Sequence, residues 1–425
     1  MTREEVNSLA LSKIDKAKYL ILELITGMGK TKVAIDLINH ICDRVFRNDE
    51  CPTTILILVA KTVHKQTWKE EIERWGGIKS DYITIECYES LKNYENSYFD
   101  VVVADEMQHL SEARIDVLET IHINESFIGL SATIKRDMRD YFIYNHKAEV
   151  IKCGLKEAVE DEVLPEPTVY LLPLTLDTTN CTYKVKKFGR DIITTQKGCY
   201  DSISSLIEWY KNKYFNSRNE RIKNLWLSTA GKRLKWCAEQ KEALVLSLLD
   251  KFRDYKTLTF CSSIEQSERL GKYNITSKNK ASVKNLEMFN LNKIKHITAC
   301  NILNEGVNLT DCRIGIFCNL NSSEIVVKQR VGRILRHKSP IIIIPYFKDT
   351  REEELVQKMI EEYSEESIVT INNINEITKN LEKEIITLEE TEENQLVNTN
   401  TEEPTTIKNI VVKVENGELI YKAEL

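Results

Sequence analysis

The chain has 425 residues, 42% of them hydrophobic, and a formal net charge of −6 at pH 7. At about 100 to 200 residues per domain, this length accommodates two ordinary domains with some surplus. No apolar run approaches the roughly 18 residues that span a bilayer, and the N-terminus is charged, which predicts a soluble, cytoplasmic protein with no membrane partner. The eleven cysteines include no Cys-x-x-Cys pair, which favours reduced core thiols over a zinc site or disulfides.

The first distinctive stretch is an apolar run from Tyr19 that stops at a glycine-containing turn and ends in Lys30 and Thr31. It predicts a buried strand, a phosphate-binding loop and a helix whose positive end faces the phosphates. Gly27 and Gly29 carry no Cβ atoms that would keep backbone N–H groups away from a phosphate. Lys30 supplies a charge for the terminal phosphates, and Thr31 offers a hydroxyl to Mg²⁺. We therefore expect nucleotide binding by the residues of this loop, namely Thr26, Gly27, Met28, Gly29, Lys30 and Thr31.

Beyond the loop, short apolar runs alternate with amphipathic stretches, which is the pattern of a parallel sheet covered by helices. Buried strands are predicted over residues 55–60, 82–88, 99–104 and 127–130, with a helix over 61–75. The strand before Asp105 and Glu106 carries both carboxylates to the edge of the sheet where ligands bind. Next to a phosphate loop, Asp105 is expected to hold Mg²⁺, partly through water, and Glu106 to orient and deprotonate the attacking water. The last strand ends in Ser131 and Thr133 at the same edge.

The middle of the chain begins with a linker marked by Pro165 and Pro167, after which a second domain starts. A segment from Tyr183 to Lys235 follows, in which lysines and arginines alternate with aromatic residues. This mixture suits a polyanion whose bases can also stack. Two helices that pack their aromatic residues on the second domain and expose their lysines are an equally good interpretation, and both can hold. The candidate nucleic-acid contacts here are Lys211, Lys213, Arg218 and Arg221.

The parallel pattern then resumes, and it decays again near the C-terminus. Strands are predicted over residues 257–261, 296–299, 314–318 and 341–345, and a helix over 351–363. The stretch after residue 364 is rich in Glu, Thr and Asn, with one possible helix over 374–388. Asn416 and Gly417 favour a two-residue turn, so residues 407–422 should form a β-hairpin. This hairpin should either dock on the second domain or wait for a protein partner.

Several of these stretches resemble the motifs of superfamily 2 helicases of the DExH type, with phage and repair translocases closest in character. The motifs similar to I, II, III and VI are Thr26 to Thr31, Asp105 to His109, Ser131 to Thr133 and Gln329 to Arg336. Those similar to Ia, Ib, IV and V lie at residues 59–75 (with Gln66 and Trp68), 87–91, 260–266 and 304–309. The resemblance covers about residues 15–360. It departs from the usual pattern in motif Ia, which lacks its proline, in motif V, which has Asn308, and ahead of Tyr19, where no adenine-reading glutamine is evident.

The resemblance implies an α/β fold with two RecA-like domains, parallel sheets and ATP in the cleft between them. Gln329, Arg333 and Arg336 would project from the second domain as catalytic residues, and Gly306 and Asn308 would join the ATP site. Nucleic acid would contact Lys61, Thr62 and Ser90, while coupling would fall to His109, Ser131 and Thr133. The expected organisation is an ATP-binding domain (1–153), a linker (154–168), the start of the second domain with the basic segment (169–256), its helicase C-terminal part (257–365), an acidic flexible segment (366–405) and the hairpin (406–425).

The function we expect is that of a helicase or translocase that uses ATP and Mg²⁺ and acts on DNA in replication, recombination or repair. If the protein is viral, its location would be the host cytoplasm. An RNA helicase is the alternative within the class. A clamp that binds nucleic acid without hydrolysis would not need Lys30, Asp105, Glu106, Arg333 and Arg336 together. The motor of a restriction system would need a nuclease or target-recognition region, and none is evident in the sequence. The oligomeric state is not predicted.

Overall fold

The computed structural model describes residues 1–49, 53–187, 189–300, 309–320, 330–332, 334–377, 409–415 and 418–424. The chain divides into two compact units, Met1–Thr370 and Ile371–Leu425, and each is described by itself. Among the helices of the described residues, none has both the length and the apolar character required to cross a bilayer.

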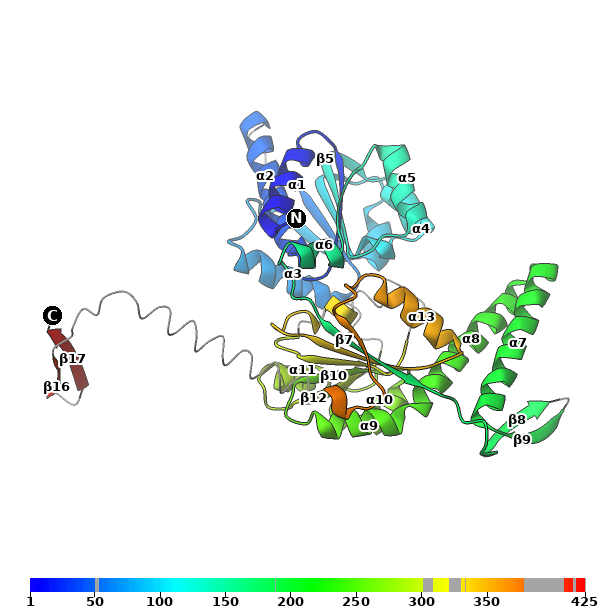
Figure 1. Ribbon diagram of the computed structural model, residues 1–425. Helices are drawn as coiled ribbons and strands as arrows, with labels where there is room; N and C mark the ends of the chain where they lie inside the picture. The colour runs from blue at the N-terminus through cyan, green and yellow to red at the C-terminus, as the bar shows by residue number, and fades with distance from the viewer. Residues whose placement is uncertain are drawn as a thin grey trace. The chain divides into compact units, whose positions relative to one another are not determined.

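The first part of the larger unit is built on a sheet that contains β5 and has helices around it (Figure 1). The sheet is parallel and six-stranded, with the order β3-β2-β4-β5-β1-β6. Its strands are β1 (Tyr19–Leu24), β2 (Ile55–Val59), β3 (Ile83–Cys87), β4 (Tyr98–Asp105), β5 (His122–Ser131) and β6 (Glu149–Cys153). All five residues of β2 are buried, because helices cover both faces of a sheet of this kind. The parallel sheet expected from the apolar runs is confirmed, and β6 is a strand that we did not predict.

Helices pack on both faces of this sheet. They are α1 (Arg3–Ile14), α2 (Lys30–Asp49), α3 (Thr62–Arg74), α4 (Glu112–Leu118), α5 (Arg136–His146) and α6 (Leu155–Glu160), with the 3₁₀ helices η1 (Tyr88–Tyr94) and η2 (Met107–His109). Successive residues of β1 pack alternately into the hydrophobic cores on the two faces of the sheet. Leu20 and Leu22 belong to the core cluster that includes Ile35 and Ile38 of α2, whereas Ile21 belongs to the cluster of Phe127 and Phe142. This alternation is the period-2 geometry of a strand buried on both faces.

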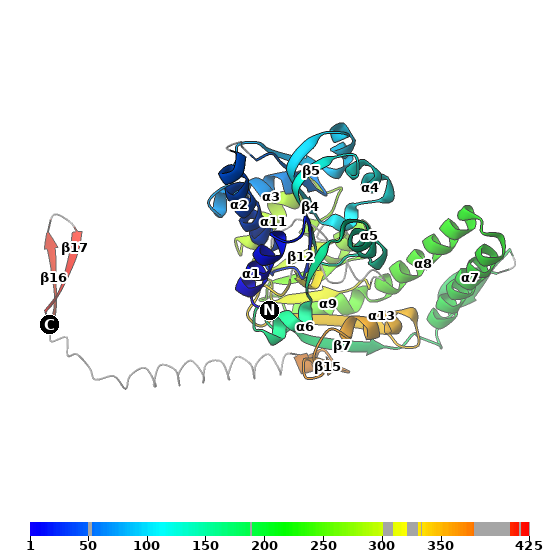
Figure 2. The ribbon, with the colours of Figure 1, turned by 90° about the horizontal axis from the view of Figure 1, so that it is seen from above.

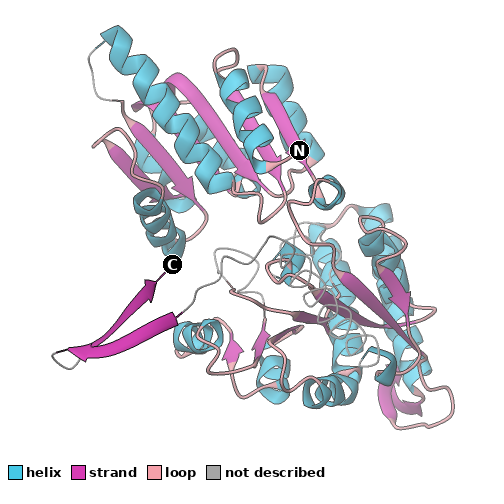
Figure 3. Cartoon of the chain, turned by 60° about the vertical axis from the view of Figure 1, so that its left-hand side comes forward, coloured by secondary structure: helices cyan, strands magenta, loops and turns pink. Residues whose placement is uncertain are grey.

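The second domain is also built on a sheet with helices around it (Figure 3). This sheet is parallel and seven-stranded, with the order β11-β12-β10-β13-β14-β7-β15. Its strands are β7 (Thr168–Leu174), β10 (Thr257–Phe260), β11 (Asn274–Ile275), β12 (His296–Ala299), β13 (Ile314–Phe317), β14 (Ile341–Phe347) and β15 (Ile368–Thr370). Cys261, Cys300 and Cys318 are buried next to it, as free thiols. We expected residues 366–405 to be an acidic flexible segment, but β15 lies within that range because it pairs with β7.

The helices of the second domain include α9 (Glu242–Lys251), α10 (Ile264–Leu270), α11 (Ser282–Asn290) and α13 (Arg351–Ile360). Between β7 and β10 the chain leaves the sheet to form a projecting element, residues 183–240, which we call the arm (Figures 1 and 2). It consists of the antiparallel hairpin β8 (Tyr183–Lys187) and β9 (Arg190–Thr194), then the paired helices α7 (Gln196–Ser217) and α8 (Glu220–Gln240). The helices agree with the helical interpretation of this basic segment, whereas the β8–β9 hairpin was not predicted.

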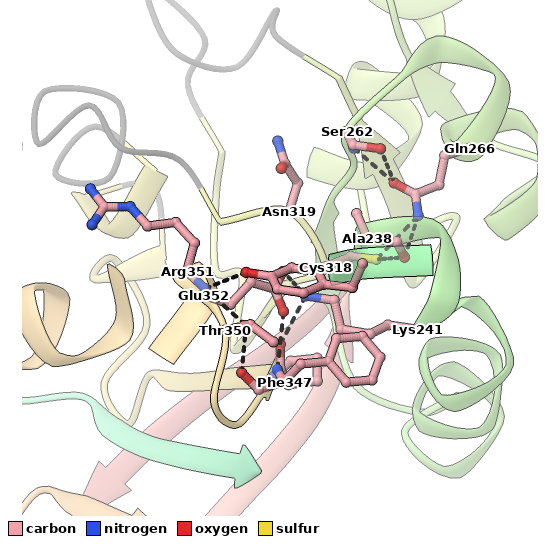
Figure 4. A network of polar contacts seen from close by, with 12 residues as sticks. Ala238, Lys241, Ser262, Gln266, Cys318, Asn319, Phe347, Thr350, Arg351 and Glu352 are labelled. Atoms are coloured by element: carbon pink, nitrogen blue, oxygen red, sulfur yellow. Dashed lines mark hydrogen bonds and ion pairs between the residues drawn. The ribbon is translucent and has the colours of Figure 1, made fainter. Parts of the chain in front are cut away.

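Buried polar contacts fix the base of the arm to the second sheet (Figure 4). Lys241, between α8 and α9, donates to the Pro345 carbonyl oxygen at 3.0 Å and to Glu352 Oε1 at 2.7 Å. The other oxygen of Glu352 accepts a hydrogen bond from the backbone N–H of Phe347 at 3.1 Å. Gln266 of α10 donates to the carbonyl oxygen of Ala238 in α8 at 2.8 Å. The arm and the end of the sheet near β14 are therefore joined through the protein interior.

The smaller unit contains an antiparallel hairpin of β16 (Asn409–Glu415) and β17 (Glu418–Glu424). Glu415 pairs with Glu418, so the two strands are connected through the predicted turn positions 416 and 417, which lie outside the described residues. The predicted hairpin is confirmed. Of the possible helix over 374–388, only residues 374–377 are among the described residues.

Candidate nucleotide-binding and hydrolysis site

The loop between β1 and α2 has the backbone geometry that its glycines were expected to provide. Gly27 and Gly29 have φ angles of 103° and 82°, in the left-handed region that favours glycine. A Cβ atom on Gly27 would also lie 3.0 Å from a methyl group of Leu164. Lys30 begins α2, and its Nζ donates to the Leu24 carbonyl oxygen at 2.8 Å. The loop is thus held between the first turn of α2 and the segment that leads to the second domain.

Asp105, the last residue of β4, is held from two sides. The indole Nε1 of Trp68 donates to Asp105 Oδ2 at 2.8 Å, and the hydroxyl of Tyr88 donates to the Asp105 carbonyl oxygen at 2.9 Å. Burial raises the pKa of Asp105 to about 6, and the neighbouring charge of Glu106 adds to this shift. The hydrogen bond from Trp68 and the positive charge of Lys30 oppose it by favouring the ionised form.

Glu106 has a φ angle of 51°, an uncommon conformation for a residue with a side chain. Its Oε2 accepts a hydrogen bond from Gln108 Nε2 at 2.6 Å. On its other side Gln108 Oε1 lies 2.5 Å from the hydroxyl oxygen of Ser131, which also accepts the backbone N–H of Thr133 at 3.1 Å. Ser131 and Thr133 are therefore connected to Glu106 through Gln108. His109 lies beside this group, with its ring stacked 6.4 Å from that of Tyr88.

The phosphate loop, Asp105 and Glu106 line one large cavity of about 1240 Å³ together with residues of the second domain. From the first domain it is lined by Arg3, Thr26, Gly27, Gly29, Lys30, Thr31, Lys32, His64, Thr67, Trp68, Glu71, Arg74, Trp75, Asp105 and Glu106. The second domain contributes Leu309, Thr310, Asp311, Leu335, Arg336, His337 and Lys338, and the linker contributes residues 159 and 162–166. A Cβ atom on Gly332 would lie 2.5 Å from the Cβ of Thr26, so the backbone at Gly332 packs directly against the phosphate loop.

The predicted second-domain residues are only partly described. Arg336 lines the cavity, while Gln329, Arg333, Gly306 and Asn308 lie outside the described residues. Arg330 has a different position, since it is 1% exposed, donates to the Asn319 carbonyl oxygen at 2.9 Å and lies 5.1 Å from the Phe260 ring. Desolvation lowers the pKa of Arg330 to about 10. This arginine therefore belongs to the core of the second domain.

The candidate nucleic-acid contacts fall into two separate groups. Lys61 and Thr62 are exposed at the start of α3, and Ser90 lies in η1. Lys211, Lys213, Arg218 and Arg221 are on the arm. There Lys213 lies 4.7 Å from the ring centre of Trp209, which is 53% exposed, and Arg218 lies 5.3 Å from that of Phe215. Cationic and aromatic side chains therefore share the exposed surface of the arm.

Three residues of the site were not assigned a role from the sequence: Trp68, Tyr88 and Gln108. Trp68 and Tyr88 are each 1% exposed, and their spacing alone is typical of ordinary core positions. No local pattern reveals that the polar atom of a buried aromatic side chain donates a hydrogen bond to Asp105, which lies elsewhere in the sequence. Gln108 was part of the Asp105 to His109 motif, but its contact with Ser131 depends on the pairing of β4 with β5.

The fold and the site define a nucleoside triphosphatase in which a phosphate loop and two carboxylates share a cavity with an arginine from a second parallel α/β domain. Residues 2–136 match the family Type III restriction enzyme, res subunit, and residues 239–338 match the Helicase conserved C-terminal domain. The DNA 3'-5' translocase XPB2 of Sulfurisphaera tokodaii is 21% identical over 369 residues, which cover 76% of each chain. The chain is a superfamily 2 helicase or translocase, and it is a nucleic-acid-dependent ATPase.

Solved structures resemble the chain at the level of the fold. An HsdR fragment assigned to a type I restriction enzyme of Vibrio vulnificus YJ016 has a TM-score of 0.56 at 19% identity, over 86% of this chain and 68% of that one. Dbp5 of S. cerevisiae, bound to RNA and ADP BeF3, has a TM-score of 0.55 at 12% identity, over 86% of this chain and 89% of that one.

Proposed function

We propose that the chain is a DNA helicase or translocase that hydrolyses ATP with Mg²⁺ and works in replication, recombination or repair. The observation that carries this proposal is the shared cavity, which is lined by Lys30, Asp105 and Glu106 of one domain and by Arg336 of the other. A site divided in this way changes shape when the two domains move. The similarity to a DNA translocase supports DNA as the substrate.

The phosphate-binding part of the mechanism depends on the first domain. The backbone N–H groups of residues 26–31 and the N-terminus of α2 would bind the phosphates, with Lys30 on the terminal ones. Thr31 and Asp105 fit a magnesium site, because both line the cavity and present the oxygen donors that Mg²⁺ prefers. The ion would neutralise charge on the phosphates. Trp68 uses only one oxygen of the Asp105 carboxylate, so the donor set remains compatible with this role.

Hydrolysis needs a base and a source of positive charge. Glu106 would accept a proton from the attacking water. Gln108 orients the Glu106 carboxylate through a hydrogen bond, and Ser131 in turn holds Gln108. Arg336 and Arg333 would stabilise the negative charge that develops on the transferred phosphoryl group. Gln329, Gly306 and Asn308 are proposed to complete the site from the same domain. His109, Ser131 and Thr133 would couple hydrolysis to nucleic-acid binding.

A second candidate is the motor of a restriction system. It is favoured by the match of residues 2–136 to the res subunit family and by the fold of the HsdR fragment. In that case a nuclease or target-recognition region would lie outside these 425 residues. An RNA helicase is a weaker candidate, because its support is the fold of Dbp5 alone.

The test is a set of steady-state ATPase measurements with single-stranded, duplex and forked DNA and with RNA, with Lys30→Ala as the background. We expect DNA to stimulate hydrolysis and RNA to have little effect. Stronger stimulation by RNA would reverse the substrate assignment. Hydrolysis that no nucleic acid stimulates would contradict the proposal as a whole. Strand displacement and triplex displacement assays then separate unwinding from translocation.

A further inference from the structure

Asp105 is connected to the two elements that carry the candidate nucleic-acid contacts of the first domain. Trp68 belongs to α3, and Tyr88 is the first residue of η1. Their hydrogen bonds to Asp105 are 2.8 Å and 2.9 Å long, and both side chains are 1% exposed. One bond fixes the carboxylate and the other fixes the backbone of the same residue. The end of β4 therefore cannot shift relative to α3 or η1 without straining one of these bonds.

The same two elements reach the surface nearby. Thr62 begins α3, six residues before Trp68 and about 9 Å along the helix axis. Ser90 lies two residues after Tyr88 in η1. A ligand that moves the start of α3 or η1 would therefore act on the groups that hold Asp105.

Two side-chain contacts join α3 to the strand end that precedes η1. Lys65 donates to Glu86 at 2.7 Å, and the Thr62 hydroxyl lies 3.8 Å from the sulfur of Cys87. Both charged groups of the first contact are only partly exposed, at 28% for Lys65 and 27% for Glu86. Because the elements are tied to each other as well as to Asp105, a displacement of one is passed to the other.

We propose that Trp68 and Tyr88 are positioning residues through which nucleic acid bound at α3 and η1 sets the position of Asp105 in the ATP site. This inference rests on the proposed function, since it requires that nucleic acid and nucleotide bind the same chain. It gives a route of coupling distinct from the one through Gln108 and Ser131, which acts on Glu106. The bond from Trp68 goes to a carboxylate and is therefore stronger than one between neutral groups, such as the bond from Tyr88 to the Asp105 carbonyl oxygen.

The test measures coupling at equilibrium rather than turnover. The dissociation constant of a fluorescent non-hydrolysable ATP analogue with Mg²⁺ is measured with and without saturating forked DNA, and the ratio is the coupling factor. We expect a factor of about 5 to 150 for the parent, the usual range for coupled sites. Trp68→Phe keeps an aromatic ring but removes the donor, and should lower the factor at least fivefold. Its affinity for DNA without nucleotide should stay within about twofold of the parent.

Matched variants separate coupling from damage to the core. Ile72→Val trims the same helix one turn away and should keep the parent's coupling factor and ATPase. Tyr88→Phe removes a single hydroxyl from η1 and should lower the factor, whereas Tyr94→Phe removes a hydroxyl from the same element and should not. If Trp68→Phe unfolds, a comparison of Tyr88→Phe with Tyr94→Phe still tests whether a hydrogen bond to Asp105 carries the coupling.

Two results would overturn the inference. One is a coupling factor in Trp68→Phe and Tyr88→Phe equal to that of the parent. The other is a loss of coupling that only follows a matching loss of DNA affinity, which would indicate a structural role. A parent protein with a factor of one and no stimulation by DNA would instead contradict the proposed function, and the inference with it.

Discussion

Lys241 and Glu352 form an ion pair inside the second domain, with Nζ 2.7 Å from Oε1 and side-chain exposures of 0% and 1% (Figure 4). Breaking a buried pair by removing one partner leaves an uncompensated charge, which costs about 3–5 kcal/mol. We therefore expect Lys241→Met to lower the free energy of unfolding by that amount in chemical denaturation. Adding Glu352→Gln should restore part of it, because the amide carries no charge and can still accept from Phe347. A double variant less stable than Lys241→Met would contradict this account.

The first catalytic prediction separates binding from hydrolysis. Lys30→Ala removes a phosphate contact, so both nucleotide affinity and turnover should fall. Glu106→Gln keeps the shape of the pocket and the contact with Gln108, so nucleotide should still bind while kcat falls by about 10² to 10⁴. Nucleotide titration and steady-state ATPase measure the two quantities. Turnover in Glu106→Gln within a few fold of the parent would remove Glu106 from its proposed role.

Arg336 should act on the transition state more than on binding, because it comes from the second domain and lines the same cavity as the phosphate loop. Arg336→Ala is expected to lower kcat by about 10³ or more, the scale of arginine fingers elsewhere, with nucleotide affinity little changed. Arg330→Ala serves as a contrast, since this residue is buried against Phe260 and should lower the melting temperature instead. A dissociation constant that rises as steeply as kcat falls in Arg336→Ala would contradict the finger assignment.

Charge reversal on the arm tests its contact with nucleic acid. Changing Lys211, Lys213, Arg218 and Arg221 to Glu should weaken DNA binding and flatten its salt dependence, by roughly 0.9 in logarithmic slope for each lost phosphate contact. The ATPase activity measured without nucleic acid should persist, because none of the described residues of the arm lines the nucleotide cavity. An unchanged slope, measured by fluorescence anisotropy over a salt series, would leave the arm with a structural role only.

The C-terminal unit should be dispensable for hydrolysis. It forms a compact unit separate from Met1–Thr370, which contains the phosphate loop and both sheets. Deletion from Glu389 onward should therefore leave the Lys30-dependent ATPase intact. A truncated protein that is folded by circular dichroism yet inactive would show that this region completes the motor.

The parts of the molecule that could be predicted are those determined by residues close together in the sequence. The phosphate loop and the Asp105-Glu106 pair follow buried strands directly, so hydrophobic runs and the residues after them located both. Other features depend on pairing between distant segments. The three residues of β15 become a strand because β7 offers them an edge. The resemblance assigned Arg336 to the site and left Arg330 without a role. The burial of Arg330 could not be predicted, since it depends on Phe260 and Asn319.

The firm base of the arm has a mechanical consequence. Helix α7 is 22 residues long, which corresponds to about 33 Å at 1.5 Å per residue. Because Lys241, Gln266 and Glu352 anchor the arm inside the second domain, any rotation of that domain turns the arm as a lever. A swing of about 10° would carry the tip through about 6 Å, close to two steps of about 3.4 Å along a nucleic-acid strand. A small rotation of the second domain thus becomes a displacement of the arm's tip on the scale of base steps.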